Sequence, residues 1–314
     1  MSRYKEIDLN RINEYSIRDR NSKVNTAQFA HQYKKGSSLA EFIETMPHIL
    51  KGNELRSLIA DIIDAVNHDR PIILMMGAHV IKCGLSPLII QLIEKKVLTC
   101  IAFNGAGIIH DTETALWGTT SEDVAAAIDD GSFGMVRETP EFINNALAAG
   151  KEMNLGYGEA VGRALTEAKC KYEELSIVAT AIRWNLPLTV HVAIGTDIVH
   201  QHPNSEGAII GELSYRDFKL FAEQVSKLER GGVVLNIGSA VILPEVFLKA
   251  LTVVRNIGHK AHGFTTANFD MIPQYRPMVN VVQRPTQKTG KGYHFTGHHE
   301  IMIPLLVALI VENL

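Results

Sequence analysis

The stretch Pro71-Ile72-Ile73-Leu74-Met75-Met76-Gly77 decides the fold class of this 314-residue chain. Five consecutive apolar residues stand between a proline and a glycine without helical spacing, which is typical of a strand buried on both faces. Similar strands are expected at 98–103, 188–192, 232–237 and 260–265. Helices are expected from Ser37, at 54–66, 86–96, near 111, 120–130, 138–150, 157–169, 173–184, 214–228, 244–256 and from about 300. Strands separated by helices predict a doubly wound α/β fold with a mostly parallel sheet.

Composition and charge narrow the class of protein. Hydrophobic residues make up 46% of the chain and charged residues 21%, as in globular proteins, and the formal net charge of -3 gives no electrostatic case for binding nucleic acid or an anionic membrane. Three widely spaced cysteines predict reduced thiols and therefore a cytoplasmic location. Since the longest apolar stretches fall short of the roughly 20 residues that a membrane-spanning helix needs, we expect a soluble protein. Residues 1–36 are polar and basic, and we expect them to form an arm. Residues 37–314 are expected to form a single α/β domain, and the arm to contribute to a homo-oligomer, a dimer or tetramer.

Small residues follow nearly every expected strand. The chain continues after the strands into Gly77-Ala-His-Val, Asn104-Gly-Ala-Gly, Gly195-Thr-Asp, Gly238-Ser-Ala and Thr265-Thr-Ala-Asn. In an open parallel sheet the ligand lies beyond the carboxyl ends of the strands, and glycine-rich turns there let backbone N–H groups approach a phosphate. Several such turns at one sheet edge predict a Rossmann-like crevice for a dinucleotide, although no G-x-G-x-x-G follows the first strand.

In their order and spacing these turns resemble the deoxyhypusine synthase family over roughly residues 70–312. The resemblance includes Thr196-Asp197 and the C-terminal Pro304-Leu-Leu-Val. It implies an NAD-binding fold, the cofactor NAD, a transferase or oxidoreductase activity on a small molecule, and assembly as a homotetramer. The residues that it places around NAD are Ala78, His79, Asn104, Gly105, Ala106, Gly107, Asp197, Gly238, Thr266 and Ala267.

One departure from that family affects the chemistry. The family holds its imine-forming lysine in a Trp-Gly-Lys stretch, whereas the matching region here, residues 275–285, contains neither Trp nor Lys. An imine requires an amine that can lose its proton, which arginine cannot supply. Lys288 and Lys291 follow the region and are expected in a solvated loop. The sequence therefore argues against deoxyhypusine synthesis itself.

Histidines are frequent at the expected strand ends. Seven of the thirteen histidines fall at expected strand ends or at the start of the last helix, and His110-Asp111 is expected to open a helix. The candidate catalytic residues are His110, Asp111, His191, His298 and His299, as proton donors and acceptors beside a hydride-accepting nicotinamide.

Two alternatives stay open. His191, His200 and His202 with Asp197 could ligate a metal in a hydrolase or lyase, although their spacing matches no established metal motif. The chain could also be a nucleotide-binding protein without catalytic activity.

Overall fold

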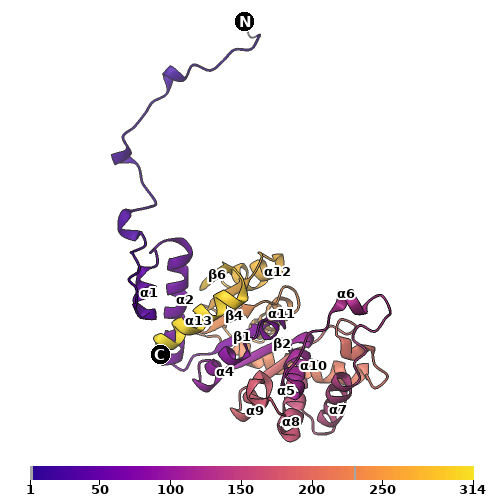
Figure 1. Cartoon of the computed structure of the whole chain (residues 1–314). Helices are drawn as coiled ribbons and strands as arrows, with labels where there is room; N and C mark the ends of the chain where they lie inside the picture. The colour runs from indigo at the N-terminus through magenta and orange to yellow at the C-terminus, as the bar shows by residue number, and fades with distance from the viewer. Residues whose placement is uncertain (1–2, 230) are drawn as a thin grey trace. The chain divides into compact units, whose positions relative to one another are not determined.

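The computed structural model describes residues 3–229 and 231–314 (Figure 1). The chain divides into two compact units, Met1–Asn53 and Glu54–Leu314. This division lies beyond residue 36, where the sequence predicted the arm to end. Among the described residues, no helix has the length and apolar content needed to cross a membrane.

The first unit contains short local structures. Three single-turn helices each begin at a polar side chain that accepts a backbone N–H: η1 (Leu9–Arg11), η2 (Ile17–Asp19) and η3 (Thr26–Gln28). The helix α1 (Leu39–Thr45) starts with a capping box, because Ser38 accepts from the Glu41 N–H while Glu41 accepts from the Ser38 N–H.

The second unit is built on one six-stranded sheet in which every strand pair is parallel. The strands are β1 (Ile72–Met76), β2 (Cys100–Asn104), β3 (Leu188–His191), β4 (Val233–Ile237), β5 (Thr265–Asp270) and β6 (Lys291–Thr296). Their spatial order is β3-β2-β1-β4-β5-β6. This order reverses between β1 and β4, which is the topological switch point of a doubly wound fold and the usual location of its ligand. The predicted fold class is confirmed.

Helices cover the two faces of the sheet. The helices of this unit are α2 (Leu50–Asn67), α3 (His79–Lys82), α4 (Ser86–Glu94), α5 (Gly105–Trp117), α6 (Val124–Ala127), α7 (Glu138–Glu152), α8 (Tyr157–Ala168), α9 (Ile177–Arg183), α10 (Gly207–Ser226), α11 (Ile242–Asn256), α12 (Tyr275–Pro277) and α13 (His299–Glu312), with the single turns η4 (Glu173–Leu175) and η5 (Ile198–Gln201) and the π-helical η6 (Met278–Gln283). Phe221 of α10 and Phe247 of α11 belong to a buried core with Ile73 and Met75 of β1. Elsewhere in this unit, α9 contacts α4, α5 and α8.

Several expected elements differ in the structure. The strand expected at 260–265 instead begins at Thr265 and runs to Asp270, with all six residues buried. Lys291, expected in a loop, is the first residue of β6. Of the helix expected at 120–130, only α6 forms. Polar residues inside β5 and the exposed side chains of the edge strand β6 hide the apolar pattern by which a strand is recognised.

Candidate functional site

The carboxyl ends of β1 to β4 bring the predicted turns to one edge of the sheet. Met76 pairs with both Phe103 and Ile237, and Asn104 pairs with His191, so these four strands end at nearly the same level. The residues that follow them therefore share this edge, as the sequence predicted.

At the switch point two glycines bring the ends of β1 and β4 into close contact. The Gly77 N–H donates to the Ile237 carbonyl at 2.9 Å, and a Cβ added to Gly77 would lie 2.2 Å from the Gly238 carbonyl oxygen. Gly238 has a φ of +65°, and a Cβ on it would lie 2.9 Å from His299 Nε2. Only glycine fits these two positions without displacing neighbouring atoms.

His299 and His79 stand beside this glycine pair. Their rings contact edge to face with centroids 5.6 Å apart, and His299 is 1% exposed. Burial lowers the pKa of the His299 imidazole, and its Nδ1 is buried without a hydrogen-bond partner in the described part of the chain. His298 precedes it as an exposed residue, with Nδ1 3.7 Å from Glu300 Oε1. The sequence grouped the two histidines, but the structure directs only His299 inward. Ala78, also predicted to contact NAD, precedes His79 at the start of α3.

The next strand end leads directly into α5. Asn104 caps this helix by accepting the Gly107 N–H at 2.9 Å, and Gly105 is the first helical residue. The helix therefore begins before His110-Asp111, and the expectation that this pair opens the helix is wrong. Both residues lie in the second turn, where a helix end exerts little electrostatic influence.

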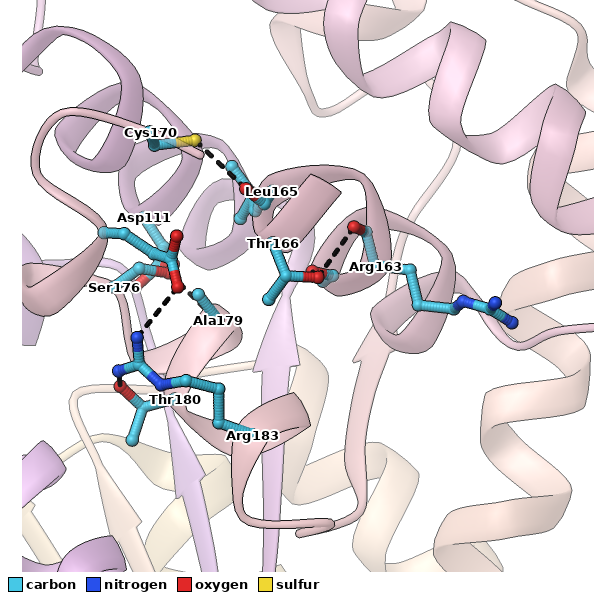
Figure 2. Close-up of polar contacts among 11 residues, drawn as sticks. Asp111, Arg163, Leu165, Thr166, Cys170, Ser176, Ala179, Thr180 and Arg183 are labelled. Carbon is cyan, nitrogen blue, oxygen red and sulfur yellow. Dashed lines mark hydrogen bonds and ion pairs between the residues drawn. The ribbon is translucent and has the colours of Figure 1, made fainter. Parts of the chain in front are cut away.

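Asp111 points into the protein, where it caps another helix. Figure 2 draws Asp111 beside Ser176, whose hydroxyl donates to the Asp111 carboxylate at 2.5 Å. The carboxylate also accepts the Ile177 N–H at 2.8 Å, at the start of α9. Burial raises the pKa of Asp111 to about 6, against the opposing effect of these hydrogen bonds. These contacts give Asp111 a structural role, capping α9 in the interior of the protein.

His110 points the other way, into a cavity of about 760 Å³. The cavity lies where the segments after β1, β2 and β3 meet. Lys82 follows β1, Ala106 and His110 lie on α5 after β2, and Asp197 follows β3. Further lining residues come from α5, from the segment around α6 and from the first turn of α7, among them Glu113, Trp117, Thr120, Glu122, Phe133 and Thr139. The volume is within the range of small-molecule sites.

Asp197 lies against the first turn of α5. A Cβ on Gly105 would stand 1.8 Å from Asp197 Oδ2, so glycine is required for this approach. The side chain is 7% exposed, and Oδ2 has no hydrogen-bond partner within the described residues. Burial raises the pKa of Asp197 to about 6. Asp197 lines the cavity, and its Oδ2 lies 4.0 Å from His200 Nε2, a second buried atom without a hydrogen-bond partner in the described residues.

The remaining histidines of the sequence hypothesis do not meet. His191 is buried against Phe221, with Nε2 3.0 Å from Thr189 Oγ1, and burial lowers its pKa to about 3. His200 Nδ1 accepts the Gly195 N–H at 3.1 Å. His202 Nε2 lies 2.8 Å from the Gly134 carbonyl. In residues 3–229 and 231–314, no three His, Cys, Asp or Glu side chains are arranged to hold a metal ion.

Thr266 and Ala267 occupy a different place from the one predicted. Both are fully buried inside β5, and the residue that reaches the carboxyl end of this strand is Asp270. Lys291 lies at the opposite, amino end of the sheet, where it pairs with Thr265 and forms an ion pair with Asp61 at 2.6 Å. The geometry thus separates Lys291 from the cavity at the carboxyl edge.

Sequence reasoning missed Glu113, Thr120 and Lys82, which all line the cavity. Glu113 could have been found, since residues three apart on a helix are neighbours and His110 is three residues before it. That inference requires the helix to begin at Gly105. Thr120 lies in an irregular segment that carries no periodic signal.

Comparison with known proteins identifies the fold. No family model matches the sequence, and no curated protein resembles it at the sequence level. Among solved structures, a candidate deoxyhypusine synthase from Entamoeba histolytica is similar, with a TM-score of 0.53 and 12% identity over 90% of this chain and 96% of that chain.

Two larger proteins share the fold with only part of their length. A cyanobacterial arginine dihydrolase, ArgZ, has a TM-score of 0.51 and 13% identity, and unliganded AgrE has a TM-score of 0.53 and 11% identity. The matches include 85% and 83% of this chain, respectively, but only 34% and 32% of those proteins. At these identities the comparisons establish a shared six-stranded parallel α/β fold.

Proposed function

We propose that the chain is an NAD-binding enzyme that oxidises or transfers a group on a small molecule at the carboxyl edge of its sheet. The observation that carries the proposal is the cavity at the carboxyl edge of the sheet, lined by the segments that follow β1, β2 and β3 in a sheet of Rossmann order. The structural likeness to a candidate deoxyhypusine synthase is consistent with it. The missing lysine and the position of Lys291 argue against deoxyhypusine synthesis.

The residues at this edge fit a dinucleotide. Asp197 Oδ2 is an unused acceptor of the kind that binds a ribose hydroxyl, and the first turn of α5 offers backbone N–H groups to a phosphate. Gly105, Gly77 and Gly238 keep the backbone free of side chains where Cβ atoms would collide. NAD+ bound there would supply a hydride acceptor. His110, in the same cavity, would exchange a proton with the substrate.

Calorimetric titration with NAD+ at pH 7.5 tests the proposal. The wild-type protein should bind NAD+, and Asp197→Asn should weaken binding by about tenfold, since a hydrogen bond to a charged group contributes about 1.5–3 kcal/mol. Asp129→Asn, which alters an exposed carboxylate outside the cavity, is the matched control and should bind like wild type. A separate sample of the protein is denatured, and its supernatant is assayed for released nucleotide. This shows whether NAD that was already bound masks the titration. Absence of both binding and co-purified nucleotide would refute the proposal.

The first unit supports a second part of this proposal, the homo-oligomer. Ile7, Leu9 and Ile12 are each at least 60% exposed, an unusual number of large apolar side chains for one short segment. We therefore propose that this segment contacts another copy of the chain. Light scattering should show a dimer or tetramer for wild type and a smaller species after all three residues are changed to serine. A monomeric wild-type protein at micromolar concentration would refute it.

A further inference from the structure

A chain of hydrogen bonds leads from His110 away from the cavity. His110 Nδ1 lies 2.6 Å from the Thr120 hydroxyl oxygen, and that hydroxyl lies 2.5 Å from Glu113 Oε2. The other carboxylate oxygen of Glu113 accepts the Thr139 hydroxyl at 3.0 Å. The side chains of His110 and Glu113 are 17% and 15% exposed, so the chain is largely shielded from water.

The chemistry of these groups fixes where each proton lies. Burial raises the pKa of the Glu113 carboxyl, but the hydrogen bonds from its neighbours outweigh this effect and keep it below its ordinary value. Glu113 is therefore an ionised group that can only accept. The Thr120 hydroxyl has one proton, which it must give to Glu113, so that its oxygen is left to accept from His110 Nδ1. A neutral His110 then carries its proton on Nδ1 and a lone pair on Nε2.

We propose that Glu113, through Thr120, is a positioning residue that holds His110 in the Nδ1–H tautomer, so that Nε2 serves as the proton acceptor of the cavity. No hydrogen bond to His110 Nε2 occurs within residues 3–229 and 231–314, and the side chain lines the cavity. Which substrate proton it takes rests on the function proposed above. Asp111, the sequence neighbour of His110, has no part in this arrangement because it caps α9.

The same arrangement stabilises the product of proton transfer. When a bound hydroxyl or amine gives its proton to Nε2, the bonding electron pair stays on the substrate oxygen or nitrogen and the imidazole becomes positively charged. Glu113 Oε2 is 3.7 Å from His110 Nδ1, close enough to offset that charge in a shielded site. The orienting carboxylate thus also supports the charged state, a division of roles known for other histidine bases.

Nitrogen NMR of the ¹⁵N-histidine-labelled full chain at pH 8 tests this inference without NAD or a substrate. Wild-type His110, assigned by its loss in His110→Ala, should show a protonated Nδ1 and an unprotonated Nε2. Thr120→Val removes the relay hydroxyl and should turn the Nδ1–H tautomer from the dominant form into the minor one. Thr120→Ser should restore it. Glu113→Ala should act like Thr120→Val, since the hydroxyl is then free to donate to Nδ1.

Glu138→Gln is the matched control, because Glu138 also lines the cavity but pairs with Arg137. It should leave the His110 signals unchanged. A wild-type protein with the proton on Nε2, or a tautomer unaffected by Thr120→Val, would overturn the inference. If Glu113→Ala does not fold, Thr120→Val and Thr120→Ser still decide it. Failure of NAD+ to bind would leave this result intact, so the two proposals fail separately.

Discussion

The two faces of α5 carry acidic side chains with opposite roles. Asp111 faces the interior, where it accepts hydrogen bonds from Ser176 and from the first backbone N–H groups of α9. Glu113, two residues later, faces the cavity and connects to His110 through Thr120. Successive residues of a helix point about 100° apart, whereas residues three apart are neighbours. Proximity in sequence therefore misleads where helical spacing informs.

Asp111 and Asp197 sharpen this comparison, because burial raises the pKa of each to about 6. Asp111 is surrounded by donors. Asp197 has an oxygen without a partner in the described part of the chain. A pKa raised to about 6 thus occurs both in Asp111, whose hydrogen bonds are satisfied, and in Asp197, which has an unsatisfied oxygen.

The largest expected effect is that of Asp111→Ala on stability. The substitution leaves the Ser176 hydroxyl and two backbone N–H groups of α9 buried without an acceptor. We expect the free energy of unfolding to fall by about 3 kcal/mol or more, since each unsatisfied buried group costs about 1–3 kcal/mol. Urea denaturation followed by circular dichroism measures this loss. A loss below about 1 kcal/mol would show that α9 does not depend on this cap.

Neutralising Asp197 should raise the free energy of unfolding, opposite to the effect of Asp111→Ala. Its pKa in the folded protein, about 6, is above the ordinary value of 3.8, so the folded state binds the proton more tightly between these values. Stability is therefore lost as pH rises from about 4 to about 6. Asp197→Asn removes this contribution and should stabilise the protein above pH 6 by at most about 3 kcal/mol, since one pKa unit corresponds to about 1.4 kcal/mol.

The wild-type protein and Asp197→Asn are compared by urea denaturation at several pH values. Asp111 also has a raised pKa, so only the difference between the two proteins isolates Asp197. A difference that does not change between pH 4 and pH 6 would contradict the account.

His110→Ala should change stability least on this helix. The side chain lines the cavity, and its removal leaves no helix cap unsatisfied, so the melting temperature should fall by about 2–4 °C, as for a loss near 1 kcal/mol.

The effect of His110→Ala on activity requires a substrate, which can be sought by screening small alcohols and amines for NADH formation. Turnover of any substrate found should then drop by about 10²–10⁴-fold. A variant that unfolds would show that His110 is structural.

We expect that the wild-type protein forms no covalent imine with an amine substrate. Lys291 is at the amino end of the sheet, paired with Asp61, and residues 275–285 contain no lysine. Borohydride treatment with spermidine should therefore leave the mass unchanged. An adduct mapped by peptide mass spectrometry to Lys288 or Lys291 would restore the imine mechanism, and one on Lys82 would assign it to the cavity instead.

The sequence predicted the fold well because apolar strands and capped helices are local signals. β1, with five buried apolar residues, and α1, with its Ser38–Glu41 capping box, lie where expected. The predicted position of β5 was wrong because the threonine and asparagine residues of this strand are polar and yet buried by neighbouring strands. That burial is a contact between distant segments, which no local sequence pattern indicates.

The candidate site was predicted less completely. Asn104, Gly105, Asp197 and Gly238 lie at or just after the ends of strands, and the structure brings them to one edge. The group around His110 includes Thr120 and Thr139, which come to Glu113 only through folding of a segment without regular periodicity. Such contacts depend on tertiary structure, so sequence spacing does not indicate them.

The most direct test of the central claim, that NAD binds at the carboxyl edge of the sheet, is an NMR titration of the deuterated, ¹⁵N-labelled protein with NAD+. The account predicts that backbone amide signals of Ala78, Gly105, Ala106 and Gly238 shift on saturation, while those of Asp61 and Lys291 at the amino edge stay unchanged. Shifts confined to the amino edge, or no shifts in a protein shown to be free of nucleotide, would contradict it.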